Sequence, residues 1–202
     1  LKTMIITLDR FRGLPSNEWV EELISNLEWR FNLKGSNENV VSFEQNQNLK
    51  GLDKLSIVLD ATSNHTPLIV LYKNFKEGGV EENVTLHPYY VKQYNNRWFL
   101  FGLNQERNQI SNLALDRILS VAQSEDVRFI PNMDVDFEHY FDDVVGVTIP
   151  KDEVKKEHII LQFTKHRFPY VTSKPIHHSQ ETISEEDCTI SIDVRPNREL
   201  TA

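Results

Sequence analysis

Residues 67–118 form a succession of short β-rich segments with no helical segment between them. Glu77-Gly78-Gly79 predicts one turn, and Asn95-Asn96 predicts a tight hairpin turn because Asn tolerates positive φ better than most residues. Parallel strands need long crossover connections, which are missing here, so these strands predict a small antiparallel barrel. The expected strands are Leu68–Tyr72, Val84–Tyr94, Arg97–Leu103 and Ile110–Ile118.

Two helices are expected before this region. Ser16 is a plausible N-cap and Gly35 lies near the end of the first helix, whose apolar residues recur at intervals of three and four. The second helix carries an apolar stripe from Leu52 to Leu59 and ends in the segment from Asn64 to Pro67. The apolar stripe of the first helix comprises Trp19, Val20, Leu23, Ile24, Leu27 and Phe31.

After a break around 131–136, the sequence predicts a small α+β lobe. Asp136–Phe141 is typical of a helical turn and Lys165–Thr172 of a short helix. The whole chain is therefore expected to be of the α+β class, with a helical region at 1–65, a barrel at 66–130 and the lobe at 131–202. The strands expected in the lobe are Val144–Ile149, His158–Phe163, Ile176–Ile183 and Cys188–Val194.

Charge and composition exclude several classes of protein. The formal net charge is -8; residues 67–125 are neutral and residues 126–202 carry -6, so this acidic chain is a poor candidate for holding duplex DNA through its phosphates. No apolar run approaches the ~20 residues of a membrane span, and no signal peptide is recognisable. The single cysteine indicates a reducing compartment, so a cytoplasmic location is expected. Because the first residue is Leu1, we expect the chain to begin inside a longer protein.

Catalytic and metal-binding interpretations have weak support. Cys188 lies on the apolar face of a predicted strand, which favours burial over a role as a nucleophile. His177 and His178 are adjacent on a predicted strand and are expected to point to opposite faces, which is unsuitable for two ligands of one metal. We therefore expect no enzymatic activity, metal or cofactor. Two carboxylate pairs, Asp134 with Asp136 and Asp142 with Asp143, are expected to be solvated.

Residues 86–103 and 113–118 resemble the WYL domain of bacterial transcriptional regulators. The tripeptide that names the family is Trp98-Phe99-Leu100, and Pro88 and Asn95-Asn96 match its strand start and hairpin turn. Asp116-Arg117-Ile118 closes the motif. The resemblance covers roughly residues 66–121 and implies an Sm-like, SH3-type barrel.

Both flanks of the barrel also resemble parts of these regulators. Phe168-Pro169-Tyr170-Val171, followed by Pro175, His177 and Ser179-Gln180, is similar to the extension domain that follows WYL, for which a ferredoxin-like fold is expected. The family pattern continues past Glu199-Leu200, so this domain is expected to be partial. The N-terminal helices resemble the linker to a DNA-binding winged helix-turn-helix, which would lie outside these residues.

The resemblance implies a sensor that binds a nucleotide or single-stranded nucleic acid and controls the attached DNA-binding domain. A homodimer is implied, with no membrane partner and with duplex DNA bound only through the missing domain. Arg97 beside Trp98 and Phe99 combines a cation with stacking faces, as a base linked to a phosphate requires. The candidate ligand-binding residues are Tyr72, His87, Tyr90, Arg97, Phe99, Arg107 and Arg117.

Two alternatives remain open from the sequence. The family often has two arginines in its closing strand where this chain has Ser111, Leu113 and Ala114, which favours a less charged ligand or a protein-interaction scaffold without a small ligand.

Trp98 is expected to pack in the core, whereas Arg117 is expected either to contact ligand or to pair with Asp116 or a backbone carbonyl.

Overall fold

A computed structural model describes residues 5, 8, 18–31, 50–75, 79–151 and 153–201. The chain divides into two compact units, Leu1–Asn132 and Met133–Ala202, which we describe separately. The predicted cap at Ser16, the helix end at Gly35 and the Glu77-Gly78 part of the predicted turn lie outside the described residues.

The two expected N-terminal helices are present. Helix α2 spans Glu18–Arg30, and its residues Val20 and Ile24 are buried, as the apolar stripe predicts. The second begins as a 3-10 turn, η1, at Leu52–Lys54 and continues as α3, Leu55–Ser63. Gly51 precedes this turn with a φ of 91°, a left-handed conformation that favours glycine.

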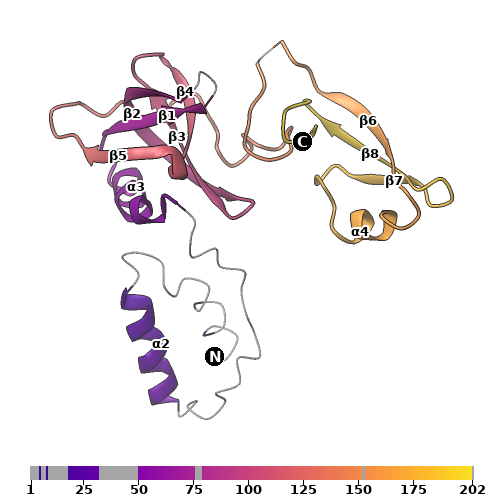
Figure 1. The fold of residues 1–202 in the computed structure, drawn as a ribbon, viewed down its shortest axis with the longest axis horizontal. Coiled ribbons are helices and arrows are strands. Elements are labelled where there is room, and N and C mark those ends of the chain that lie inside the picture. The colour runs from indigo at the N-terminus through magenta and orange to yellow at the C-terminus, as the bar shows by residue number, and fades with distance from the viewer. Residues whose placement is uncertain are drawn as a thin grey trace. The chain divides into compact units, whose positions relative to one another are not determined.

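The first unit contains a five-stranded antiparallel sheet in the order β4-β3-β2-β1-β5 (Figure 1). β4 and β5 are its two edges, so the described strands do not close into a barrel and the Sm-like barrel remains a prediction. The strands are β1, Leu68–Asn74; β2, Val80–Tyr94; β3, Arg97–Asn104; β4, Gln109–Ala114; and β5, Ile118–Gln123.

The single strand predicted at Ile110–Ile118 is wrong, because a 3-10 turn, η3, interrupts it at Leu115–Arg117. The chain uses this turn to pass from pairing with β3 to pairing with β1, and Leu115 is buried within it. The alternation of apolar residues across the turn imitates one continuous strand.

The Asn95-Asn96 hairpin is confirmed. The φ angles are 46° at Asn95 and 59° at Asn96, and Tyr94 pairs with Arg97 across the two-residue loop. Positive φ at both central residues is the requirement of the type I′ turn, whose twist matches that of the flanking strands. This turn fixes which side chains of β3 face the core.

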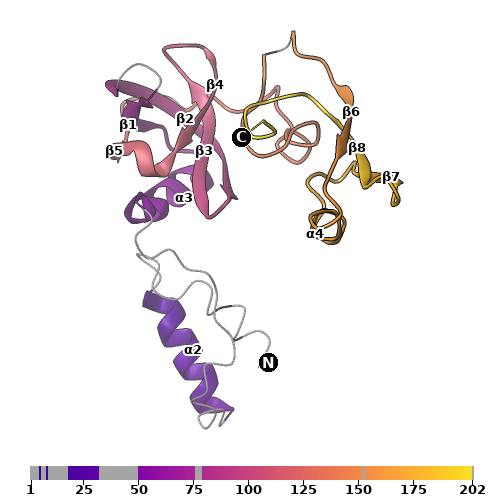
Figure 2. The ribbon, with the colours of Figure 1, turned by 45° about the vertical axis from the view of Figure 1, so that its right-hand side comes forward.

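The core of the first unit lies between α3 and one face of the sheet (Figure 2). Trp98 packs against this core and Leu100 is buried in it, so the predicted core position of Trp98 is confirmed. Alternation along β3 places Arg97 and Phe99 on the opposite face. The buried cluster comprises Leu55, Val58, Ala61, Leu68, Val70, Tyr72, Val84, Leu86, Leu100, Leu113, Leu115 and Ile118.

The second unit has a three-stranded antiparallel sheet in the order β6-β8-β7 and one short helix, α4, Phe168–Ser173. Phe168, Ile190 and Ile192 are buried in its core. This arrangement confirms a mixed α and β lobe, while the ferredoxin-like fold remains a prediction. The strands are β6, Glu157–Gln162; β7, Glu181–Ser184; and β8, Thr189–Val194.

Two predictions for this unit are wrong. Residues 144–149 form no strand, although Val144, Val145 and Val147 are buried as loop residues. Residues 176–180 form bends and turns, and only the end of the predicted strand pairs with β8. The rings of His177 and His178 therefore do not point to opposite faces; their centroids are 4.1 Å apart.

Cys188 is buried in the core of the second unit, as its apolar surroundings predict. In the parts of the chain that the structure describes, no helix combines the length and hydropathy needed to cross a membrane.

Candidate functional site

Three predicted site residues lie where β3 begins and β4 ends, and we name this group, with Phe75 and Asp116, the charged edge: Phe75, Arg97, Phe99, Asp116 and Arg117. Arg97 is the first residue of β3, and Asp116 lies in η3. The register pairs Phe99 with Ala114, which brings the start of η3 beside the start of β3. The pairing of β3 with β4 thus brings together Arg97 and Asp116, which are 19 residues apart in the sequence.

Arg97 and Asp116 form an ion pair. Nη2 of Arg97 donates to Oδ1 of Asp116 at 2.8 Å and to Oδ2 at 2.7 Å. The two side chains are 36% and 24% exposed, and the Arg97 guanidinium carbon lies 5.5 Å from the centre of the Phe99 ring. The carboxylate therefore neutralises a cation that the sequence analysis assigned to a ligand.

Arg117 has a different environment. Its guanidinium carbon lies 4.5 Å from the centre of the Phe75 ring, which is 58% exposed. Its Nε is buried and has no hydrogen-bond partner among the described residues. The predicted pairing of Arg117 with Asp116 is therefore replaced by the pair between Arg97 and Asp116. A buried donor without a partner is uncommon in proteins and requires an explanation.

Arg107 lies in the turn after β3, at the opposite end of that strand from Arg97. Its Nη2 donates to Oε2 of Glu82, and its backbone N–H donates to Oδ1 of Asn104 at 2.9 Å. These contacts fix the turn between β3 and β4. Arg107 is therefore a paired surface cation outside the charged edge.

Tyr72 is 7% exposed and belongs to the core. Its hydroxyl oxygen accepts a weak hydrogen bond from the Ala114 N–H at 3.4 Å, which connects β1 to the end of β4. The phenol of Tyr72 therefore supports the sheet, and its burial makes it unsuitable for contacting a ligand.

His87 is fully buried, and both of its ring nitrogens have protein partners. Nδ1 accepts from the Ile130 N–H at 3.1 Å, and Nε2 lies 3.2 Å from Oε1 of Gln105. Tyr90, by contrast, is 37% exposed, and it pairs with Phe101 of β3. Of these two predicted ligand residues, only Tyr90 has an accessible side chain.

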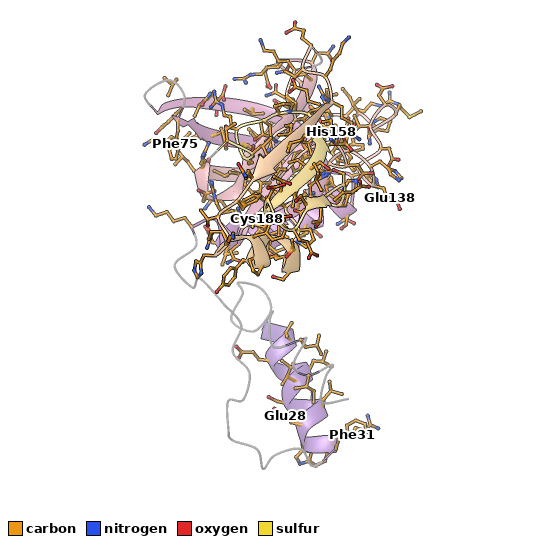
Figure 3. The ribbon with its side chains drawn as sticks, turned by 90° about the vertical axis from the view of Figure 1, so that its right-hand side faces the viewer. Glu28, Phe31, Phe75, Glu138, His158 and Cys188 are labelled. Carbon is orange, nitrogen blue, oxygen red and sulfur yellow. The ribbon has the colours of Figure 1, made fainter. Side chains whose placement is uncertain are left out.

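Phe75, which directly follows β1 and is labelled in Figure 3, was not among the predicted site residues. It is close to Arg117 because Tyr72 of β1 pairs with Ile118 of β5, one residue after Arg117. An aromatic residue at the end of a strand is a weak signal by itself. Only the pairing of β1 with β5 brings it to the arginine.

A further depression, of about 580 Å³, lies on the first unit and does not include the charged edge. It is open to solvent and is formed almost entirely by the segment that follows β5. The residues that line it are Gln105, Asp126, Val127, Arg128, Phe129, Ile130 and Pro131.

In the second unit, Asp136, Glu138 and His139 bring three potential metal-ligating atoms within 4.8 Å of one another. All three side chains are exposed, and Nδ1 of His139 lies 2.8 Å from Oδ2 of Asp136. This hydrogen bond lowers the pKa of Asp136 and raises the pKa of His139. Asp136 and His139 form a surface ion pair, and the three exposed side chains by themselves are insufficient evidence of a metal site.

Comparisons with known proteins place the first unit in context. Residues 53–123 match the family model described as the WYL domain, a range that begins in η1 and so includes α3 with the sheet. A solved structure, Proteasome accessory factor B/C (PafBC) of Arthrobacter aurescens, is similar with 13% sequence identity and a TM-score of 0.35, over 72% of this chain. The chain spans only 21% of that protein's length, and no curated protein matches it.

Proposed function

The chain carries a WYL domain over residues 53–123, and from this premise we propose that it is the ligand-sensing region of a bacterial transcriptional regulator. In this proposal, the sheet unit binds a nucleotide or a short single-stranded nucleic acid. The binding controls a helix-turn-helix domain elsewhere in the same protein, which acts in the cytoplasm as a homodimer. The chain itself performs no catalysis.

The observation that carries the proposal is the Arg117–Phe75 pair. The Phe75 ring is exposed, and the Arg117 guanidinium lies over one of its faces, 4.5 Å from its centre. In this proposal a base stacks on the face that Arg117 does not cover, and the guanidinium supplies the cation next to it. Base stacking on an aromatic side chain contributes about 1–3 kcal/mol per base and tolerates every base.

The charge at this site favours a ligand with few phosphates. Asp116 already neutralises Arg97, and Glu82 neutralises Arg107. Of the three predicted arginines, Arg117 alone has no carboxylate partner within the described residues. A ligand with one base and one phosphate group on this edge therefore fits better than a polyphosphate.

Calorimetric titration of the chain with deoxymononucleotides and with a five-nucleotide single-stranded DNA tests this proposal. We expect the DNA to bind, and we expect Arg117→Ala and Phe75→Leu each to weaken it about tenfold, the value of a lost stacking or charged contact. Arg167→Ala is the matched control. The guanidinium carbon of Arg167 lies 5.9 Å from the centre of the Tyr170 ring in the second unit, so this substitution removes the same charge from a similar arginine–aromatic pair. Binding that survives Arg97→Ala combined with Arg117→Ala would eliminate the charged edge as the site.

A second candidate is a protein-interaction module in which the sheet is a scaffold without a small ligand. The pairing of Arg97 and Arg107 with carboxylates favours it, since charges that are satisfied internally are less available to an anion. The same titrations discriminate the two candidates. Absence of binding by any nucleotide or single-stranded DNA supports the scaffold.

A further inference from the structure

The segment after β5 is attached to the sheet by specific contacts. We name residues 125–131 the strap; it leads from the sheet toward Met133, where the second unit begins. Just before it, the Ser124 N–H donates to the Pro67 carbonyl at 2.8 Å. The strap has no regular secondary structure, so its backbone groups depend on other partners.

His87 provides one of these partners. Because the Ile130 N–H is a donor, Nδ1 of His87 must be the acceptor, and the proton of the neutral ring resides on Nε2. That proton is directed at Oε1 of Gln105, 3.2 Å away. The ring is fully buried, so each nitrogen has a single role: one holds the strap and the other holds the turn after β3.

Tyr89 provides the second partner through a β-bulge. The register of β2 with β3 shifts between Pro88 and Tyr90, which leaves Tyr89 as the extra residue. Pro88 favours this irregularity because it has no N–H to donate to the ladder. The Tyr89 hydroxyl donates to the Ile130 carbonyl at 2.9 Å. The N–H and the carbonyl of Ile130 are thus both held by side chains of β2.

Aromatic packing completes the attachment. The ring of Phe129 meets three rings at steep angles, with centroid distances of 5.2 Å to His65, 5.9 Å to His87 and 5.9 Å to Tyr89. Edge-to-face pairs at such distances are favourable. Phe129 therefore packs against the same ring that binds the Ile130 N–H.

We propose that His87 is a proton-sensitive latch that holds the strap on the sheet while the ring is neutral and releases it when the ring is protonated. Protonation at Nδ1 removes the only acceptor that the ring offers to the Ile130 N–H and places two donors face to face. It also places a charge in a fully buried position, which is unfavourable without a counter-ion. The latched state binds fewer protons than the released state, so acidification favours release.

Several polar and charged groups surround His87. From the turn after β3, Gln105 is neutral, and Glu106 is a carboxylate that interacts electrostatically with His87. Burial opposes the ionisation of Glu106, but hydrogen bonds from Thr85 outweigh it and lower the pKa of this carboxyl, so Glu106 is charged at neutral pH. The other titratable groups nearby are Tyr89 of β2, His65 across Phe129, and Asp126 and Arg128 of the strap.

Release detaches the strap from the sheet. It does not require the ligand site, because the contacts of the latch involve none of the residues of the charged edge. Failure of the latch would therefore leave the proposed sensing function unaffected, and the reverse also holds.

Hydrogen exchange of the whole chain, read by NMR as protection factors corrected for the intrinsic effect of pH, tests the latch. We expect protection of the Ile130 amide to fall about tenfold between pH 7.5 and pH 5.5, the value of one lost hydrogen bond, while the Leu100 amide of the core stays protected. This range is the one in which an imidazole in water takes up a proton.

Three variants separate the contributions. His87→Asn keeps an acceptor at the position of Nδ1 but does not titrate, so Ile130 should be protected equally at both pH values. His87→Phe keeps a ring against Phe129 but has no acceptor, so protection should be low at both. Tyr89→Phe should lower the protection of the Ile130 amide at both pH values, and this protection should still be lower at pH 5.5 than at pH 7.5. Equal protection of wild-type Ile130 at the two pH values, or a loss in His87→Asn that matches the wild type, would overturn the proposal even if His87→Phe does not fold.

Discussion

The charged edge and the latch lie on the same sheet and use polar side chains in opposite ways. At the charged edge, Arg97 and Asp116 are partly exposed and neutralise each other, and Arg117 stacks on an exposed ring. At the latch, His87 is fully buried and both ring nitrogens are engaged. The difference follows from burial: a buried polar group must find a protein partner, whereas an exposed one exchanges partners with water or a ligand.

The expected energies of the two regions differ accordingly. Partly exposed ion pairs contribute about 0–1 kcal/mol to stability, whereas leaving a buried donor or acceptor without its partner costs about 1–3 kcal/mol. Substitutions around the latch should therefore affect the folding of the sheet. Substitutions at the charged edge should affect binding more than folding.

The largest effect is expected from Gly102→Ala in β3, next to the backbone of His87. An added Cβ would lie 2.3 Å from the backbone oxygen of His87 and 3.0 Å from Cγ of Leu86. Because the first obstacle is backbone, we expect a loss of about 3 kcal/mol or more in the free energy of unfolding, measured with urea.

Gly79→Ala is the matched control for this substitution. Its Cβ would meet only the flexible end of Lys73, at 3.1 Å, so the cost there is mainly that of a φ of 86° and should be about 1 kcal/mol. Equal losses in the two variants would show that the close approach of β2 and β3 at Gly102 is unimportant.

A smaller effect on folding, with a clear effect on binding, is expected from Asp116→Asn. The substitution removes the charge that neutralises Arg97, so stability should fall by no more than about 1 kcal/mol. Affinity for a 5′-phosphorylated single-stranded DNA should rise about fivefold to tenfold, as measured by calorimetry, because a second cation becomes available.

Glu82→Gln frees Arg107 in the same way and serves as the control. If the ligand binds at the charged edge, this variant should change affinity less than Asp116→Asn does. A gain that is confined to Glu82→Gln would move the site to the turn after β3.

The smallest effect concerns His177 of the second unit, which provides an independent comparison with His87. Nδ1 of His177 also accepts a backbone N–H, from Ser179 at 3.2 Å, and burial lowers the pKa of the ring. The folded unit therefore binds fewer protons than the unfolded chain below about pH 6.5, so its stability should decline as the pH falls from 7 toward the lowered pKa.

Thermal unfolding of the chain at pH 7.5 and pH 5.5 measures this decline. His177→Asn, which retains an acceptor near the position of Nδ1, should reduce the difference between the two pH values. If His177→Asn shows the same pH dependence as the wild type, His177 does not contribute to it.

The sequence predicted the local parts of the fold well. The Asn95-Asn96 turn, the core position of Trp98 and the strands on either side of the turn follow from φ preferences and from alternation. The errors occurred where a turn interrupts an apolar run, as at Leu115–Arg117, or where buried loop residues imitate a strand, as at 144–149. In both cases buried apolar residues lie outside a regular strand although their pattern predicted one.

The candidate site was only partly predictable. Arg117 was identified from its motif, but its contact with Phe75 depends on the pairing of β1 with β5. His87 was predicted to donate to the ligand from the same face of the barrel as Arg97, but the structure buries it fully. Its partner at Ile130 lies 43 residues further along the chain.

By itself, the sequence determined the Asn95-Asn96 turn and the apolar face of β3, because these properties depend on the φ preferences and side chains of neighbouring residues. The tertiary structure alone decided that Asp116 pairs with Arg97 and not with the adjacent Arg117, and that His87 holds Ile130. Such partners are set by strand register, by the bulge at Pro88 and by the course of the strap. A polar side chain acquires its role from the residues that folding places around it.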